Sequence, residues 1–115
     1  MTESQNVEYK EIWKDDYLKW VCGFANSQGG TIFIGINDAG SVVGLQNIAK
    51  LMEDIPNKIL SGLGIVADVN RHVRDGKEYL EIKVTGPGTF PISYHGEFYC
   101  RSGATNQKLT GIAPD

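Results

Sequence analysis

Three acidic residues in the first third of the chain have side chains of the type that binds hard divalent cations. Glu3 and Glu8 lie within the first ten residues, and Asp38 follows a short β-branched segment. Three carboxylates that converged would hold Mg²⁺ or Mn²⁺, which activates water for phosphodiester cleavage. Glu3 and Glu8 can meet only if the chain bends between them, because their spacing puts them on opposite faces of a strand. Asp38 has a structural alternative, since Asp in an Asn-Asp-Ala-Gly turn commonly bonds its own backbone.

Basic residues are spread along the chain rather than gathered in one run, which is typical of a solvated surface. Lys10, Arg101 and Lys108 fall at predicted strand ends and loops, where folding could bring them together to contact phosphates. Such contacts depend strongly on salt and carry little sequence information. The last predicted hairpin adds aromatic side chains that could stack on bases or pack in the core: Tyr94, Phe98 and Tyr99.

Two glycine patterns resemble phosphate-binding loops but lack what phosphate capture requires. Segment 62–67 (GLGIVA) matches G-x-G-x-x-A, yet it follows a predicted helix and opens a strand, the reverse of the order needed. Segment 30–37 has the glycine spacing of a P-loop, but Ile36 and Asn37 stand where Lys and Ser or Thr are required. We therefore expect no ATP hydrolysis.

The histidines and cysteines show no catalytic or zinc-binding pattern. His72 and His95 fall on predicted strand and turn positions, with no motif that pairs them with a nucleophile. Cys22 and Cys100 have no second Cys or His at a zinc-site spacing. We expect solvated histidines and buried, reduced thiols.

The apolar pattern predicts short alternating elements that would position these residues. Helices are predicted over 15–27 and over 46–60, where Pro56 suggests a kink or a break. Strands are predicted over 7–10, 31–36, 41–45, 65–73, 80–84, 92–94 and 97–101. Hairpin turns are predicted at 38–40, 75–76 and 95–96. The fold class is therefore α+β: a mixed or antiparallel sheet of short strands and hairpins, with about two helices on one face.

Length and charge limit the functions that the chain can have. Its 115 residues, 41% of them hydrophobic, predict a single domain over residues 1–115. Eleven basic against fourteen acidic residues give a net charge of −3, so any nucleic-acid surface must be a local patch. The polar N-terminus and the lack of a long apolar run predict a cytoplasmic protein that does not enter a membrane. The abrupt end after segment 109–115 (LTGIAPD), which has no capping signal of its own, suggests a domain excised from a longer protein.

Four segments taken together resemble the AlbA-type DNA-binding domain, which is related to the Schlafen core. They are 3–10 (ESQNVEYK), 24–40 (FANSQGGTIFIGINDAG), 43–44 (VG) and 98–106 (FYCRSGATN). The resemblance covers nearly the whole chain. It implies an α+β nucleic-acid-associated domain, found in bacteria at the N-terminus of longer transcriptional regulators.

The resemblance also implies a catalytic alternative. In Schlafen endoribonucleases two glutamates and an aspartate form a metal-dependent site that cuts structured RNA, and by motif these fall on Glu3, Glu8 and Asp38. Those nucleases use two copies of the domain as a clamp, whereas this chain has one copy unless it forms a homodimer.

Three hypotheses follow, in order of preference. The first is a module that binds DNA or RNA, with Lys10, Arg101 and Lys108 contacting phosphates. The second is a dimerisation or protein-interaction platform whose acidic motif is structural. The third is a nuclease that uses Mg²⁺ or Mn²⁺ on Glu3, Glu8 and Asp38. Binding is preferred to catalysis because the family resemblance supports the fold more firmly than it supports any chemistry.

Overall fold

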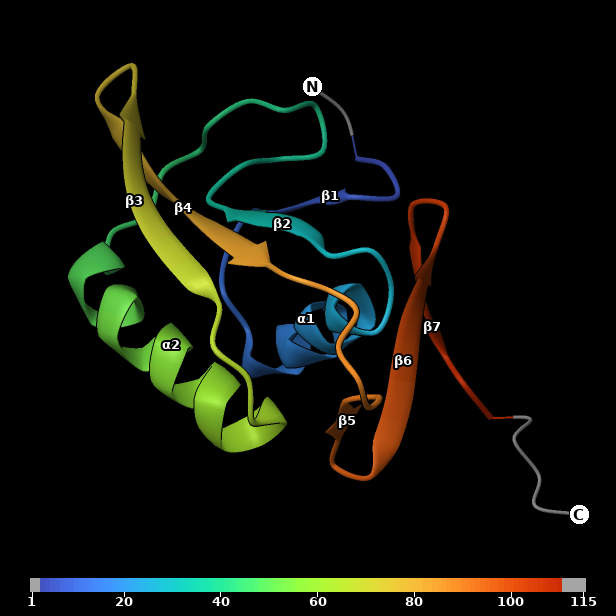
Figure 1. Ribbon diagram of the computed structural model, residues 1–115. Coiled ribbons are helices and arrows are strands. Elements are labelled where there is room, and N and C mark those ends of the chain that lie inside the picture. The colour runs from blue at the N-terminus through green and yellow to red at the C-terminus, as the bar shows by residue number, and fades with distance from the viewer. Residues whose placement is uncertain (1–2, 111–115) are drawn as a thin grey trace, which may run out of the picture.

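The computed structural model describes residues 3–110 and consists of two sheets and two main helices (Figure 1). The larger sheet has the strand order β1-β2-β4-β3, with β1 parallel to β2 and the other pairs antiparallel. Its strands are β1 (Val7–Lys10), β2 (Gly30–Ile34), β3 (Asp68–Arg74) and β4 (Lys77–Val84). The smaller antiparallel sheet contains β5 (Ser93–Tyr94), β6 (Glu97–Ser102) and β7 (Thr105–Lys108). The predicted α+β class is confirmed.

The main core lies on one face of the larger sheet. Ile32 and Ile34 of β2 and Ile82 of β4 are fully buried there, together with the apolar sides of both helices. The opposite face carries a smaller cluster in which Tyr9 and Phe33 pack beside Ile36 and Tyr79. Since strand side chains alternate between faces, Glu8 and Lys10 of β1 project on the same side as Ile32 and Ile34, toward the helices.

Helix α1 (Leu18–Ala25) follows a 3₁₀ turn, η1 (Asp15–Tyr17), so the first predicted helix is confirmed with a tighter start. Helix α2 (Ile48–Leu63) continues through Pro56, and the predicted break there is wrong. The buried stripe on α2 lies on both sides of the proline and holds the two halves against the sheet. The helix ends at Gly64, whose φ of 71° is the left-handed conformation that glycine adopts readily.

Two of the three predicted hairpins are confirmed. Asp75-Gly76 joins β3 to β4, and His95-Gly96 joins β5 to β6; each pair has positive φ at both residues, as a tight two-residue turn requires. The strand predicted over 41–45 is wrong, because that segment forms only one isolated bridge, between Ile36 and Val42. The amides of residues 43 and 44 both donate to the Gly35 carbonyl, which turns the chain away before a ladder can form.

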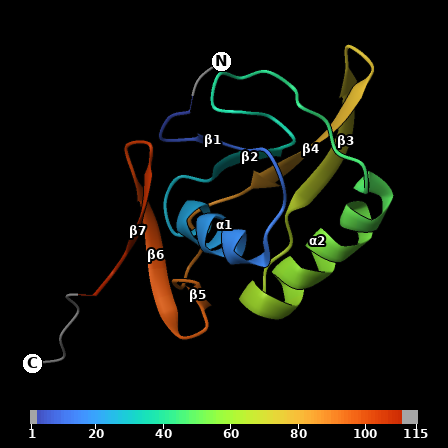
Figure 2. The ribbon, with the colours of Figure 1, turned by 180° about the vertical axis from the view of Figure 1, so that it is seen from behind.

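Helix α1 lies between the two sheets, as the front and rear views show (Figure 2). It contacts β2 and β4 on one side and all three strands of the smaller sheet on the other. The strand β7 was not predicted, since Thr105–Lys108 is polar throughout and has no apolar alternation. None of the helices in residues 3–110 has the length and apolar character to cross a membrane.

Candidate functional site

The N-terminal segment bends sharply just before β1. A bend of this kind is needed for the side chains of Glu3 and Glu8 to meet. The Ser4 amide donates to the Val7 carbonyl over 2.9 Å, and this contact folds Glu3 back along the strand. The Tyr9 amide then donates to Oε2 of Glu3 over 3.0 Å. The bend brings the carboxyl groups of Glu3 and Glu8 within hydrogen-bonding reach of each other.

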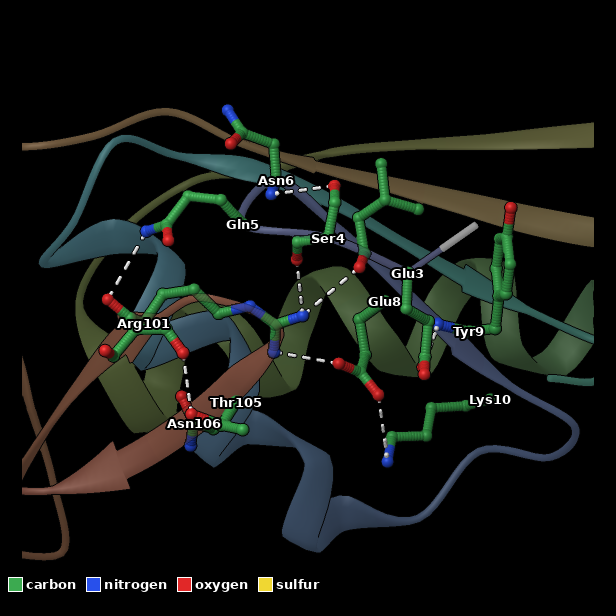
Figure 3. A network of polar contacts seen from close by, with 12 residues as sticks. Glu3, Ser4, Gln5, Asn6, Glu8, Tyr9, Lys10, Arg101, Thr105 and Asn106 are labelled. Atoms are coloured by element: carbon green, nitrogen blue, oxygen red, sulfur yellow. Dashed lines mark hydrogen bonds and ion pairs between the residues drawn. The ribbon is translucent and has the colours of Figure 1, made fainter. Parts of the chain in front are cut away.

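Glu8 lies between two cations from opposite ends of the chain (Figure 3). Its Oε1 is 2.8 Å from Nη1 of Arg101 on β6, and its Oε2 is 3.4 Å from Nζ of Lys10. The Arg101 side chain is fully buried, and its Nη2 donates to the carbonyls of Ser4 and Val7 over 2.8 and 3.2 Å. The guanidinium also lies 4.8 Å from the centroid of the Phe24 ring. Arg101 therefore ties β6 of the smaller sheet to the beginning of the chain.

The environment moves the pKa values of the two glutamates in opposite directions. Burial and the adjacent Glu3 carboxyl raise the pKa of Glu8, against the opposing effect of Arg101 and Lys10. Burial also acts to raise the pKa of Glu3, but hydrogen bonds with Glu8 and the Tyr9 amide, together with the two cations, lower it overall. The two carboxyl groups form one coupled acidic pair that shares its countercharges with Arg101 and Lys10.

Lys10 contacts both Glu8 and two aromatic rings at the start of α1. Its Nζ lies 4.7 Å from the ring centroid of Tyr17 and 4.3 Å from that of Trp20, distances typical of cation–π contacts. The Lys10 side chain is 19% exposed, so these contacts enclose most of it and part of the side chain meets solvent. The sequence signal for this contact is the spacing of Tyr17 and Trp20, which places both rings on one face of a helix.

The smaller sheet brings Lys108 to the same helix. Nδ2 of Asn106 donates to the Lys19 carbonyl of α1 over 3.1 Å, so this side of β7 faces the helix. Lys108 lies two residues further along and is exposed on that same side. Lys19 is also partly exposed and pairs with Asp16 at 2.7 Å. The structure thus places Lys10, Lys19 and Lys108 around α1; Lys19 was not among the predicted site residues.

Arg101 has a different setting from the two predicted lysines. Its guanidinium is enclosed by Glu8, two backbone carbonyls and an aromatic ring, so a phosphate could reach it only if the Glu8 pair opened. The phosphate contact stays a prediction, and the geometry gives Arg101 a structural role. Of the three aromatic residues predicted to stack or pack, Tyr99 is buried, while Tyr94 and Phe98 are half-buried.

A family model described as Schlafen, AlbA_2 matches residues 3–110. The chain belongs to this Schlafen/AlbA_2 family. One similar solved structure is the DIP2311 protein from Corynebacterium diphtheriae, with a TM-score of 0.74 and 21% identity; the match covers 91% of this chain and only 22% of that one. Another is the N-terminal domain of an ATP-dependent DNA helicase RecG-related protein from Nitrosomonas europaea, with a TM-score of 0.63 and 22% identity, covering 94% of this chain and 84% of that one.

The residues of this Schlafen/AlbA_2 domain do not fit the metal site that the sequence resemblance implies. Within residues 3–110 no group of three Asp, Glu, His or Cys side chains is arranged to hold a cation. Asp38 lies exposed in a turn that Asn37 stabilises, since Oδ1 of Asn37 accepts from the amides of Ala39 and Ser41. Glu8 is already paired with two cations. The catalytic role of Glu3, Glu8 and Asp38 stays a prediction for which the described residues do not supply the geometry.

We expect millimolar MnCl₂ or MgCl₂ to leave the thermal unfolding midpoint of the Schlafen/AlbA_2 domain unchanged. A cation that bound the folded state alone would raise the midpoint, because binding adds to the free energy of unfolding. The matched comparison is Glu8→Gln, with each protein measured against its own metal-free sample. A metal-dependent rise in the native protein that Glu8→Gln abolishes would contradict this expectation and support the metal site.

Proposed function

We propose that this domain binds nucleic acid through the exposed side of α1, as a module of a larger regulator. The α1 surface, as used below, consists of Lys10, Lys19 and Lys108 with the rings of Tyr17 and Trp20. The observation that carries the proposal is the position of Lys10, whose ammonium lies against two aromatic rings and whose side chain is partly exposed. Cations fixed beside aromatic rings are what a nucleic-acid strand contacts through its phosphates and bases.

The charge balance at the α1 surface supports a local patch. Glu8 is countered by buried Arg101 as well as by Lys10, and the pKa of its carboxyl group is raised. Glu3 and Glu8 together are matched by Arg101 and Lys10, so this group of two carboxyl groups and two cations is close to neutral and does not repel a phosphate. Lys19 has an exposed partner, Asp16, and surface ion pairs of this kind contribute little and are easily exchanged for a phosphate. Lys108 adds a third cation from β7.

The similar structures are consistent with this proposal. The Nitrosomonas europaea domain is the N-terminal part of a protein named after a DNA helicase, and the match covers most of that domain. In the DIP2311 protein the matched region is about a fifth of the chain, which is the arrangement expected of a module joined to other domains. We extend nucleic-acid binding to this chain on the strength of the α1 surface.

The first test is binding of fluorescently labelled DNA and RNA oligonucleotides, followed by anisotropy at several salt concentrations. Lys10→Ala and Lys108→Ala are each expected to weaken binding several-fold at low salt and to reduce the slope of log K against log salt by about 1. Lys83→Ala is the matched control, because Lys83 is exposed on β4 and projects on the opposite face of the sheet.

Two results would overturn the proposal. One is the absence of binding to any of these nucleic acids at low ionic strength. The other is an equal loss of affinity in Lys83→Ala, which would show that only overall charge matters. Light scattering on the same samples tests the predicted homodimer.

A further inference from the structure

A groove opens beside α2, next to the α1 surface. The groove is lined by Ile12 and Trp13, which follow β1, and by residues 44–47. The first turns of α2 also line the groove, where Leu51 supplies apolar surface and Lys50 supplies a charged side chain. Its volume is about 530 Å³, within the range of sites that hold small organic ligands. Ile12 is 54% exposed, so apolar surface is presented to solvent at the mouth of the groove.

The indole of Trp13 is held in a fixed orientation. Its Nε1 donates to Oδ1 of Asp15 over 2.8 Å, and Asp15 is held in turn by Nζ of Lys58 at 2.8 and 3.0 Å. The hydrogen bond engages the polar edge of the indole, and Trp13 is one of the residues that line the groove. A flat aromatic wall of fixed orientation can stack on a ligand without the entropy cost of ordering a mobile side chain.

A row of aromatic rings connects this groove to the α1 surface. Trp13 packs edge-to-face against Tyr17 with ring centroids 6.2 Å apart, and Tyr17 packs in the same way against Trp20 at 5.5 Å. Lys10 lies over the last two rings. The row of rings therefore joins the position of Lys10 to the groove without a break.

Charge in the groove is balanced. Lys50 pairs with Asp54 at 3.2 Å, and Lys58 pairs with Asp15. Within the described residues that line the groove, each lysine thus has its own carboxylate. The groove offers ring stacking and apolar contact rather than attraction for phosphate, which distinguishes it from the surface around Lys10.

We propose that the groove takes an unpaired nucleobase that stacks against Trp13, so that the domain prefers single-stranded to duplex nucleic acid. The inference rests on the proposed function, because the strand reaches the groove from the α1 surface. Bases in a duplex are stacked on each other and present only their edges, whereas an unpaired base has a free face for the indole. Stacking of this kind tolerates any base, so little sequence preference is expected.

The experiment compares binding of a labelled oligothymidine with binding of a labelled duplex of equal length. Trp13→Ala is expected to weaken single-strand binding about ten-fold or more, as loss of one stacked base does, while duplex binding and the salt slope stay unchanged. Trp13→Phe should retain most of the affinity because it keeps a ring. Gln46→Trp fills the groove from the exposed loop without removing Trp13, and it should reproduce the loss if Trp13→Ala folds poorly.

The outcomes separate the inference from the proposed function. A wild-type protein that binds, with single-strand binding unchanged in Trp13→Ala and Gln46→Trp, overturns the groove and leaves the α1 surface in place. Equal losses on single strands and duplex also overturn it. If Lys10→Ala reduces the salt slope and Trp13→Ala does not, both proposals are supported. Binding to neither probe overturns both.

Discussion

Replacement of Arg101 by Met is expected to lower the free energy of unfolding by about 3–5 kcal/mol, measured by urea denaturation. The guanidinium is fully buried between Glu8, the carbonyls of Ser4 and Val7, and the ring of Phe24. Met fills a similar volume but leaves the Glu8 carboxylate and both carbonyls without this partner. Removing one member of a buried ion pair is costly mainly because the other charge stays buried.

The matched control for this prediction is Arg71→Met. Arg71 forms an ion pair with Glu78 across β3 and β4, but its side chain is 48% exposed and water replaces the partner. We expect a much smaller loss there, because exposed ion pairs contribute little to stability. Equal losses in the two variants would show that burial does not strengthen the Arg101 contacts, and would contradict its structural role.

Asn26→Ala is the second replacement with a large expected effect, a loss of about 3 kcal/mol or more. The side chain of Asn26, just after α1, donates to the carbonyls of Ile92 and Tyr99, both over 2.8 Å. Its Oδ1 accepts from the Ile92 amide over 2.6 Å. Alanine would leave the Ile92 amide and the Tyr99 carbonyl without these partners and the Ile92 carbonyl with only the weak Cys22 thiol donor, and each buried orphan costs about 1–3 kcal/mol.

Asn37→Ala provides the comparison for Asn26, because Asn37 also bonds two backbone amides but does so in an exposed turn. The expected loss is about 1 kcal/mol or less, since water can satisfy the freed amides. Asn26→Asp tests the donors directly: a carboxylate can still accept from Ile92 but faces two carbonyls that it cannot donate to. Stability close to that of the native protein in Asn26→Asp would contradict the assigned hydrogen bonds.

The elements that could be predicted are those whose sequences carry a local periodicity or a turn signal. The stripe on α2 and the positive-φ pairs Asp75-Gly76 and His95-Gly96 determine their structures locally, and they are found where they were predicted. The strand β7 could not be predicted, because its polar residues become a strand only by pairing with β6. The segment 41–45 has β-forming residues, but contacts with Gly35 and with β4 decide its path.

For the candidate site, residue types were easier to predict than environments. From their spacing, Glu3 and Glu8 could meet only if the chain bent between them, and the structure contains such a bend. Arg101 is buried because α1 and β1 enclose it, and both elements lie more than seventy positions earlier in the sequence. No local sequence pattern around Arg101 could have predicted this burial. The cation–π position of Lys10 also depends on the tertiary fold, although the helical spacing of Tyr17 and Trp20 was visible.

The bonds from Arg101 to Ser4 and Val7 span 97 and 94 positions of the sequence. During synthesis on a ribosome, the N-terminal edge strand therefore emerges long before the residue that fastens it. Because contacts between distant parts of a chain form late and slow the folding reaction, this domain must wait until nearly all of its residues have left the exit tunnel. Until then β1 can pair with β2 but lacks the arginine that fastens it, and its open edge is available to chaperones and to other chains.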